Sequence, residues 1–302
     1  PKRMKDQRID AALSEMIPDY SRSKITAWIR SGDALINNKT FKPKDKVNGN
    51  ETVSLKLKQK DNNHWLPEKI NLDIVFEDDD IIVINKPFGL VTHPGAGNWS
   101  GTLANALLHH DSHLSSLDRA GIVHRLDKNT SGLMVVSKNL KSQKFLVEQL
   151  QNHSVEREYS AIVYGHMISG GSINEPIGRD PKDRVKQAIR TNGKEALTHY
   201  RVIDRFKSHT HVKAILETGR THQIRVHLSH IEHPLIGDPM YGGRVRFPKK
   251  ACQELKDELI NFQRQALHSK KLTLTHPTTG KSMTWKANLP DDMQELLNIL
   301  KN

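Results

Sequence analysis

The spacing of apolar residues divides the chain into two parts. In the first part, apolar side chains recur at helical intervals in two short stretches: Ile9, Ala12, Leu13, Met16 and Ile17, and then Ile25, Trp28 and Ile29. Pro18 and Asp19 should end the first helix, and Ser21 is a suitable N-cap for the second. The segments ALINN and ETVSLKL then alternate like strands around the basic segment KTFKPKDKV. We therefore expect a small α/β domain over residues 1–58.

After a polar, proline-containing joint over residues 59–69, the spacing changes to longer alternating runs. The runs that predict strands are IVFEDDDIIVINKP, REYSAIVYG, THYRVIDRF, HTHVKAILE and KKLTLTHP. Helical patterns begin near Thr102 and cover residues 141–151, 221–233 and 291–300. Strands and helices do not alternate regularly, which disfavours a doubly wound parallel sheet. We expect an α+β domain over residues 70–302, built on a mixed, largely antiparallel sheet.

The stretch GIVHRLDKNTSGLMVV, residues 121–136, places Asp127 in a polar loop between the strand-like runs GIV and LMVV. A loop aspartate often caps a helix or closes an Asx turn, and that structural role stays open. However, Thr130, Ser131 and Gly132 can fix such a loop without it. Neighbouring cations also keep a partly desolvated carboxylate ionised. Such a carboxylate can attack an electrophile or stabilise positive charge, so Asp127 is a candidate catalytic residue.

The segment LETGRTHQIRVH supplies candidate partners for that acid. Gly219 allows a tight turn into a helix, for which Thr221 is a candidate N-cap. Arg220 and Arg225 lie at the start and in the first turns of this helix. Either arginine could pair with Asp127, and either could instead bind phosphate or face solvent.

Tyr159 opens the predicted strand REYSAIVYG, on the same face as Ala161 and Val163. A core tyrosine is the simplest interpretation of that pattern. The alternative is a ring that stacks on a flat base and holds its hydroxyl near reacting atoms.

Charge and motif content narrow the range of functions. The 302 residues carry a formal net charge of +12, which favours a polyanionic partner, nucleic acid before membrane. A single cysteine, Cys252, excludes an internal disulfide framework and fits a cytoplasmic location. The sequence has no HExxH, GxGxxG or GxxxxGK[ST] motif, so neither a metal site nor a nucleotide cofactor is expected. It also has no long apolar run, and PKRMKDQRID lacks the core of a signal peptide.

Several motifs together resemble a known family. HRLDKNTSG, REYSAIVYG, GRTHQIRVH and HPLIGDPMYGG occur in this order and are similar to the motifs of the RluA-type RNA pseudouridine synthases. SRSKITAWIRSGDALINN is similar to the S4 RNA-binding domain, and NKPFGLVTHPG adds to a likeness to the branch called ribosomal large subunit pseudouridine synthase D. The resemblance covers nearly the whole chain. It implies that a uridine is detached at its N1–C1′ bond, rotated and rejoined through C5, without cofactor or metal.

The resemblance also assigns roles to residues. Asp127 matches the catalytic aspartate, Tyr159 the tyrosine of the second motif, and Arg225, ahead of Arg220, the arginine that pairs with the aspartate. Arg125 matches an arginine implicated in base flipping. The other residues expected at the substrate are His124, Arg220, Leu235 and Ile236. The cations expected to contact RNA are Arg22, Lys24, Arg30, Lys182, Arg184 and Lys186.

The reaction fits a single carboxylate, because cleavage of a glycosidic bond leaves positive charge on the sugar. Either Tyr159 or Asp127 would take the proton from C5. Two alternatives stay open: a non-catalytic RNA-binding factor in ribosome assembly, and the same reaction on transfer RNA. We expect a monomer whose partner is large-subunit ribosomal RNA or a pre-ribosomal particle.

Overall fold

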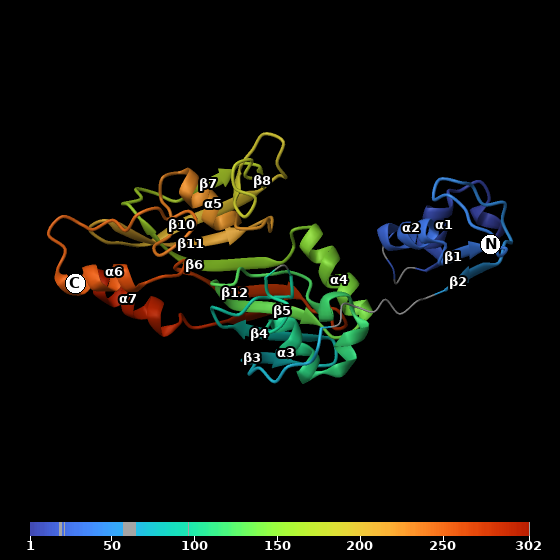
Figure 1. Ribbon diagram of the computed structural model, residues 1–302, viewed down its shortest axis with the longest axis horizontal. Coiled ribbons are helices and arrows are strands. Elements are labelled where there is room, and N and C mark those ends of the chain that lie inside the picture. The colour runs from blue at the N-terminus through green and yellow to red at the C-terminus, as the bar shows by residue number, and fades with distance from the viewer. Residues whose placement is uncertain (18–19, 21, 57–64, 96, 302) are drawn as a thin grey trace. The chain divides into compact units, whose positions relative to one another are not determined.

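The computed structural model divides the chain into two compact units, Pro1–His64 and Trp65–Asn302 (Figure 1). The structure describes residues 1–17, 20, 22–56, 65–95 and 97–301. The predicted helix end at Pro18 and Asp19, the predicted N-cap Ser21 and the linker residues 59–64 lie outside the described residues. Each unit is described by itself.

The smaller unit contains a 3-10 helix, two α-helices and two strands: η1 (Lys2–Met4), α1 (Ile9–Met16), α2 (Arg22–Ser31), β1 (Ala34–Ile36) and β2 (Val53–Leu55). The strands pair antiparallel. The helical spacing is confirmed for Ile9, Ala12, Leu13, Ile25 and Ile29, whose side chains form one buried cluster, whereas Met16 at the end of α1 is exposed. The pattern therefore predicted both the elements and their buried faces.

The larger unit is built on one nine-stranded sheet with the order β3-β4-β5-β12-β6-β11-β10-β7, to which β13 adds beside β12. These strands are β3 (Ile74–Glu77), β4 (Ile81–Lys86), β5 (Ser131–Ser137), β6 (Glu156–Tyr164), β7 (Gly171–Asn174), β10 (Leu197–Arg205), β11 (His209–Leu216), β12 (Leu267–Thr275) and β13 (Ser282–Lys286). Neighbours pair antiparallel except β5 and β12, which are parallel. The expected mixed, largely antiparallel α+β fold is confirmed.

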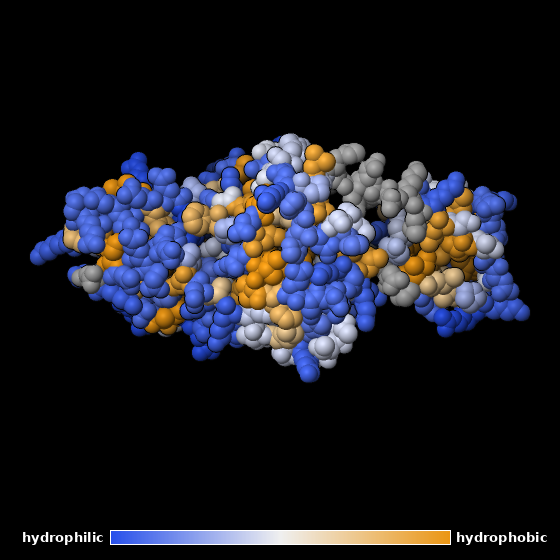
Figure 2. All heavy atoms as spheres, turned by 90° about the horizontal axis from the view of Figure 1, so that it is seen from below, coloured by the Kyte–Doolittle hydropathy of each residue, from blue (hydrophilic) through white to orange (hydrophobic). Residues whose placement is uncertain are grey.

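Both faces of this sheet are covered. Its helices are α3 (Leu103–His110), α4 (Leu140–Gln151), α5 (Gln223–His230), α6 (Gln253–Asn261) and α7 (Asp291–Lys301), with the 3-10 helices η2 (Ser112–Ser116) and η3 (Asp118–Gly121). Along β4, Ile82 packs in one cluster with Leu107 of α3, whereas Ile81 packs in another with Leu146 of α4. Alternate side chains of a strand point to opposite faces, so α3 and α4 cover opposite sides. Figure 2 shows one outer face, where hydrophilic side chains surround a smaller hydrophobic area of the larger unit.

Three local expectations were wrong. Residues 65–69, expected in the linker, are part of the larger unit: Trp65 packs against its core, and Asn105 Nδ2 donates to the Leu66 carbonyl at 2.8 Å. The run GIV is not a strand: Gly121 ends η3, and Ile122 forms only a single bridge to Val136. The N-cap of α5 is His222 rather than Thr221, and it has a left-handed φ of 56°.

The start of β5 lies against β12, and this contact positions the loop before it. Gly132 has a φ of 111°, and a Cβ atom there would collide with the backbone of Ser269. Only glycine fits such a close approach between neighbouring strands. Ser131 Oγ is hydrogen-bonded to His268 Nδ1 at 2.9 Å across the same junction. The end of the loop is thereby fixed to the centre of the sheet.

Candidate active site

The loop that carries Asp127 is held by side chains from distant segments. Lys86, at the end of β4, donates from Nζ to the carbonyl of Lys128 at 3.2 Å. Thr92 Oγ1 donates to the Leu126 carbonyl at 2.8 Å, and Gln265 Nε2 donates to Thr130 Oγ1 at 3.0 Å. The loop is therefore fixed by contacts that do not involve the Asp127 carboxylate, which leaves that group to face outward from the loop.

Lys86 makes the most demanding of these contacts. Its side chain is among the largest that are fully buried, and Nζ also donates to the carbonyls of Pro87 at 2.8 Å and Leu90 at 2.9 Å. Burial lowers the pKa of Lys86 to about 7, and the nearby Asp127 opposes that shift. Three carbonyl acceptors match the three donors of an ammonium group.

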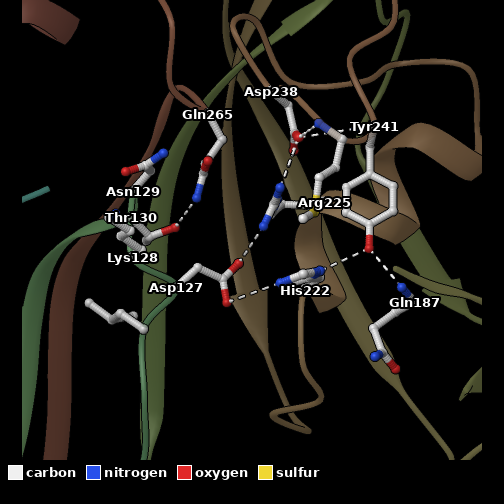
Figure 3. A network of polar contacts seen from close by, with 12 residues as sticks. Asp127, Lys128, Asn129, Thr130, Gln187, His222, Arg225, Asp238, Tyr241 and Gln265 are labelled. Atoms are coloured by element: carbon white, nitrogen blue, oxygen red, sulfur yellow. Dashed lines mark hydrogen bonds and ion pairs between the residues drawn. The ribbon is translucent and has the colours of Figure 1, made fainter. Parts of the chain in front are cut away.

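Asp127 is paired with Arg225, on α5. Arg225 Nη1 donates to Asp127 Oδ2 at 2.9 Å, and the two side chains are 5% and 16% exposed. The other edge of the guanidinium holds Asp238, with Nε–Oδ2 at 2.7 Å and Nη2–Oδ1 at 2.9 Å. Burial alone would lower the pKa of Arg225, but hydrogen bonds and charge from Asp238 and Asp127 raise it above its usual value. The arginine is therefore a fixed cation that orients Asp127 (Figure 3).

The second oxygen of Asp127 faces His222. His222 Nε2 lies 3.8 Å from Asp127 Oδ1, and His222 Nδ1 is hydrogen-bonded to the Tyr241 hydroxyl at 2.8 Å. The backbone N–H of Gln187 donates to the same hydroxyl at 2.9 Å. Figure 3 shows His222 between Asp127 and Tyr241, with Gln187 beside the Tyr241 hydroxyl.

Asp127, Arg225 and His222 border a cavity of about 530 Å³. Of the residues predicted from the sequence, the cavity is lined by His124, Arg125, Asp127, Tyr159, Arg220 and Arg225. A cavity of this size is in the range of binding sites for small molecules. Its wall combines one paired carboxylate, several cations and an aromatic ring, which suits a sugar, a base and adjacent phosphates.

Tyr159 is both a core residue and part of the cavity wall. Its side chain is 5% exposed and packs in the same cluster as Ala161 and Val163, which confirms the predicted shared face. Burial raises the pKa of the Tyr159 hydroxyl, and Arg157 opposes the shift. The group at neutral pH is therefore a protonated phenol, which can stack and donate a hydrogen bond.

The remaining cavity residues have separate partners. Arg220 Nε donates to the Glu195 carbonyl at 2.8 Å, so Arg225 rather than Arg220 pairs with Asp127. His124 Nε2 accepts a hydrogen bond from the Val135 N–H at 3.0 Å, and burial, together with Arg157, lowers the pKa of His124 to about 3. Arg125 is exposed beside these groups.

Two predicted substrate contacts lie elsewhere. Leu235 and Ile236 are both fully buried, and neither lines the cavity. Leu235 packs in one core cluster and Ile236 in another, because consecutive residues point to opposite faces of the sheet. Their expected contact with a base stays a prediction, and the cavity is formed without them.

The predicted RNA-binding cations occupy two surfaces. Lys182, Arg184 and Lys186 lie in the turn between β8 (Ile177–Arg179) and β9 (Gln187–Ile189), which form a separate two-stranded sheet. In the smaller unit, Arg22 pairs with Asp10 at 3.0 Å, Lys24 lies over the rings of Tyr20 and Trp28, and Arg30 is exposed.

Residues to which the sequence assigned no role complete the site. Asp238, Lys86, His222 and Tyr241 all belong to motifs quoted above, but their roles depend on contacts between distant segments. A usable signal was present for Asp238, which is an acid at the end of the apolar run LIG.

Among the described residues, no group of three or more histidine, cysteine or acidic side chains is arranged to hold a metal ion. None of the described helices combines the length and apolar character needed to span a membrane.

Comparison with known proteins shows which family the chain is similar to. The family model described as RNA pseudouridylate synthase matches residues 80–230, which include Asp127, Tyr159 and Arg225. A protein of Yersinia pestis called "Ribosomal large subunit pseudouridine synthase D" is 53% identical over 98% of this chain and 91% of its own length. A protein of the same name from Xanthomonas campestris is 49% identical over 98% of this chain and 89% of its own.

A solved structure is also similar. The human RNA pseudouridylate synthase domain containing 4 shares 26% sequence identity, with a TM-score of 0.58 over 76% of this chain and 92% of its own. The family model matches half of the chain, and the two relatives are about 50% identical over almost its full length. The chain therefore belongs to the RNA pseudouridylate synthase family.

Proposed function

We propose that this enzyme converts uridine to pseudouridine in large-subunit ribosomal RNA. The observation that supports the reaction is the ion pair of Asp127 with Arg225 in the wall of a cavity of about 530 Å³. The names of the relatives at 49% and 53% identity support the substrate. The +12 net charge of the chain suits a polyanion of that kind.

The steps follow from the positions of the groups. Asp127 acts at C1′ of the flipped uridine, either as nucleophile or as a stabiliser of positive charge, while the N1–C1′ bond breaks and its electrons stay on the uracil. The uracil rotates within the cavity and C5 bonds to C1′, displacing Asp127 if the carboxylate has formed a bond there. The C5 proton is then lost and N1 gains one, so the net change is an isomerisation. Arg225 keeps Asp127 oriented, and the phenol of Tyr159 supports the base. Because that phenol is protonated, Asp127 is the better acceptor for the C5 proton.

RNA must be opened at the target, because a stacked uridine cannot reach the cavity. Base flipping costs a few kcal/mol and needs a group that replaces the extruded base. Arg125, exposed beside Asp127, suits this role. The smaller unit, similar to an S4 domain, and the turn with Lys182, Arg184 and Lys186 would hold the surrounding phosphates. The enzyme acts on this substrate as a monomer.

The test is tritium release from large-subunit ribosomal RNA labelled with 5-tritiated uridine, with wild type and Asp127→Asn compared. We expect release by wild type only, while Asp127→Asn binds the RNA within a few-fold of wild type, because phosphate contacts dominate affinity. A transfer RNA labelled in the same way is the control substrate. Release from transfer RNA alone would overturn the assigned substrate, and binding without release from either RNA would favour an assembly factor.

A further inference from the structure

The two oxygens of Asp127 lie in different surroundings. Oδ2 accepts a hydrogen bond from Arg225 at 2.9 Å, whereas Oδ1 lies 3.8 Å from His222 Nε2, too far for a hydrogen bond. The His222 side chain is 14% exposed and lines the cavity beside Asp127. A small movement would close this gap, and the oxygen that is not held by Arg225 is the one it would reach.

The position of the His222 proton follows from its partners. The Tyr241 hydroxyl accepts a hydrogen bond from the Gln187 N–H at 2.9 Å, so its own proton is available for His222 Nδ1 at 2.8 Å. A neutral imidazole that accepts at Nδ1 carries its proton on Nε2. Nε2–H then points at Asp127.

The charges around His222 favour this neutral form. Burial lowers the pKa of His222, and Asp127 opposes the shift. The charged and titratable groups that face the ring are Asp127, Arg225, Asp238, Arg125 and Tyr241. The guanidinium of Arg225 also lies 5.0 Å from the centre of the Tyr241 ring, so one aromatic side chain contacts both partners of the aspartate.

The backbone at His222 is also unusual. Its φ of 56° lies in the left-handed region, and its side chain makes no capping bond to α5. Non-glycine residues seldom adopt this conformation, and such strain occurs often at functional sites. Here the strained turn directs the imidazole toward the cavity.

We propose that His222 is a positioning residue that donates its Nε2–H to Oδ1 of Asp127 when uridine is bound. The Tyr241 hydroxyl and the backbone N–H of Gln187 in β9 keep the proton of His222 on Nε2. This inference rests on the proposed function, since the group it positions is the catalytic acid. It makes the β8–β9 sheet, which carries the basic turn, a structural part of the active site as well as an RNA-facing surface.

Two substitutions at one position separate this role from a merely structural one. In His222→Gln, the longer amide can place an N–H near the position of Nε2, but it does not reproduce Nδ1. In His222→Asn, the shorter amide can replace Nδ1 toward Tyr241 but cannot reach Asp127. Asparagine also tolerates the left-handed backbone better than glutamine does. A structural role therefore favours His222→Asn, and the proposed donor role favours His222→Gln.

The measurement is the single-turnover rate of tritium release at saturating 5-tritiated RNA, with the dissociation constant measured in parallel. We expect His222→Asn to slow the step on the order of 10- to 100-fold, as a slight misplacement of a catalytic group does. His222→Gln should recover most of that loss, and affinity should stay within a few-fold in both. Equal rates in the two variants, or a faster His222→Asn, would overturn the inference. Absence of release by wild type would instead reject the proposed function.

Tyr241→Phe gives a second measurement, and its first part keeps His222, so that part does not depend on the folding of the His222 variants. It removes only the hydroxyl that sets the tautomer, and we expect it to slow single turnover in the wild-type background. In the His222→Asn background it should have no further effect, because groups that act through one another are not additive. Independent, additive losses would overturn the route through Tyr241.

Discussion

Arg225 uses one edge of its guanidinium for Asp238 and the remaining nitrogen for Asp127. The Nε and Nη2 atoms lie 2.7 and 2.9 Å from the two Asp238 oxygens, and Nη1 lies 2.9 Å from Asp127. Asp238 is completely buried, and it also accepts the backbone N–H groups of Met240 and Tyr241. The planar fork of the arginine is thereby fixed before the substrate arrives.

Replacement of Asp238 should therefore affect stability as well as catalysis. Asp238→Asn removes the charge that compensates a buried guanidinium, and loss of one partner of a buried ion pair costs about 3–5 kcal/mol. We expect a loss of that order in the free energy of unfolding, measured in urea. Single turnover should slow at the same time, because Arg225 can turn away from Asp127.

The control for that variant is Asp183→Asn. Asp183 forms an ion pair with Lys186 at 3.8 Å, with side chains 45% and 38% exposed. Exposed pairs contribute little, about 0 to 1 kcal/mol. If both variants lost the same stability, the buried pair would not have the importance given to it here.

A second prediction concerns the buried Lys86. Lys86→Met keeps the apolar stem but removes the donor shared by the Pro87, Leu90 and Lys128 carbonyls. Because each buried polar group without a partner costs about 1–3 kcal/mol, we expect a loss on the order of 3 kcal/mol in urea unfolding. The exposed Lys141→Met on α4 is the control, with no comparable effect. A loss no larger than the control's would mean that water replaces the ammonium group.

A third prediction concerns pH. The pKa of His124 is lowered to about 3 in the folded chain, against an ordinary value of 6.5. Between these values the unfolded state binds the proton and the folded state does not, so stability is lost as the pH falls below 6.5. At pH 5, some 1.5 units lower, the loss from this one residue is about 2 kcal/mol.

His124→Gln tests this directly. The Gln oxygen can still accept the Val135 N–H, but it does not titrate. We expect the melting temperature to fall less between pH 7 and pH 5 in this variant than in wild type. Identical pH profiles would show that His124 is not neutral and buried in the way described.

A fourth prediction concerns the turn between β8 and β9. Alanine at Lys182, Arg184 and Lys186 should weaken RNA binding and reduce the slope of log affinity against log salt by about 2 to 3, as three phosphate contacts would. Single turnover at saturating RNA should change little, because these side chains lie outside the cavity. The control removes the same charge at exposed positions elsewhere: Lys141, Lys207 and Lys281. An equal change of slope in the control would mean that net charge alone, not this turn, determines the salt dependence.

Local patterns predicted much of this architecture, because periodicity reports which face of an element is buried. The two helices that bury Leu13 and Ile25 in the smaller unit were predicted in this way. So were the long strands of the larger unit and the face of β6 on which Tyr159 lies.

The polar network was less accessible. From the sequence, either Arg220 or Arg225 could pair with Asp127. Only the position of α5 in the fold shows that Arg225 does so, while Arg220 donates to the Glu195 carbonyl. Asp238 pairs with Arg225, and Lys86 donates to backbone carbonyls. Neither kind of contact produces a periodic pattern in the sequence. The burial of Leu235 and Ile236 in two separate core clusters was not predicted either, because adjacency in a motif does not say which face each side chain occupies.

The position of β12 has a consequence for biosynthesis. This strand pairs with both β5 and β6 in the middle of the sheet, yet its residues, Leu267–Thr275, come near the end of the chain. During translation, β5 and the loop before it emerge long before the strand that they pack against. The catalytic site can therefore be completed only after β12 has been synthesised, and chains truncated before β12 should emerge inactive, with two open strand edges that invite aggregation.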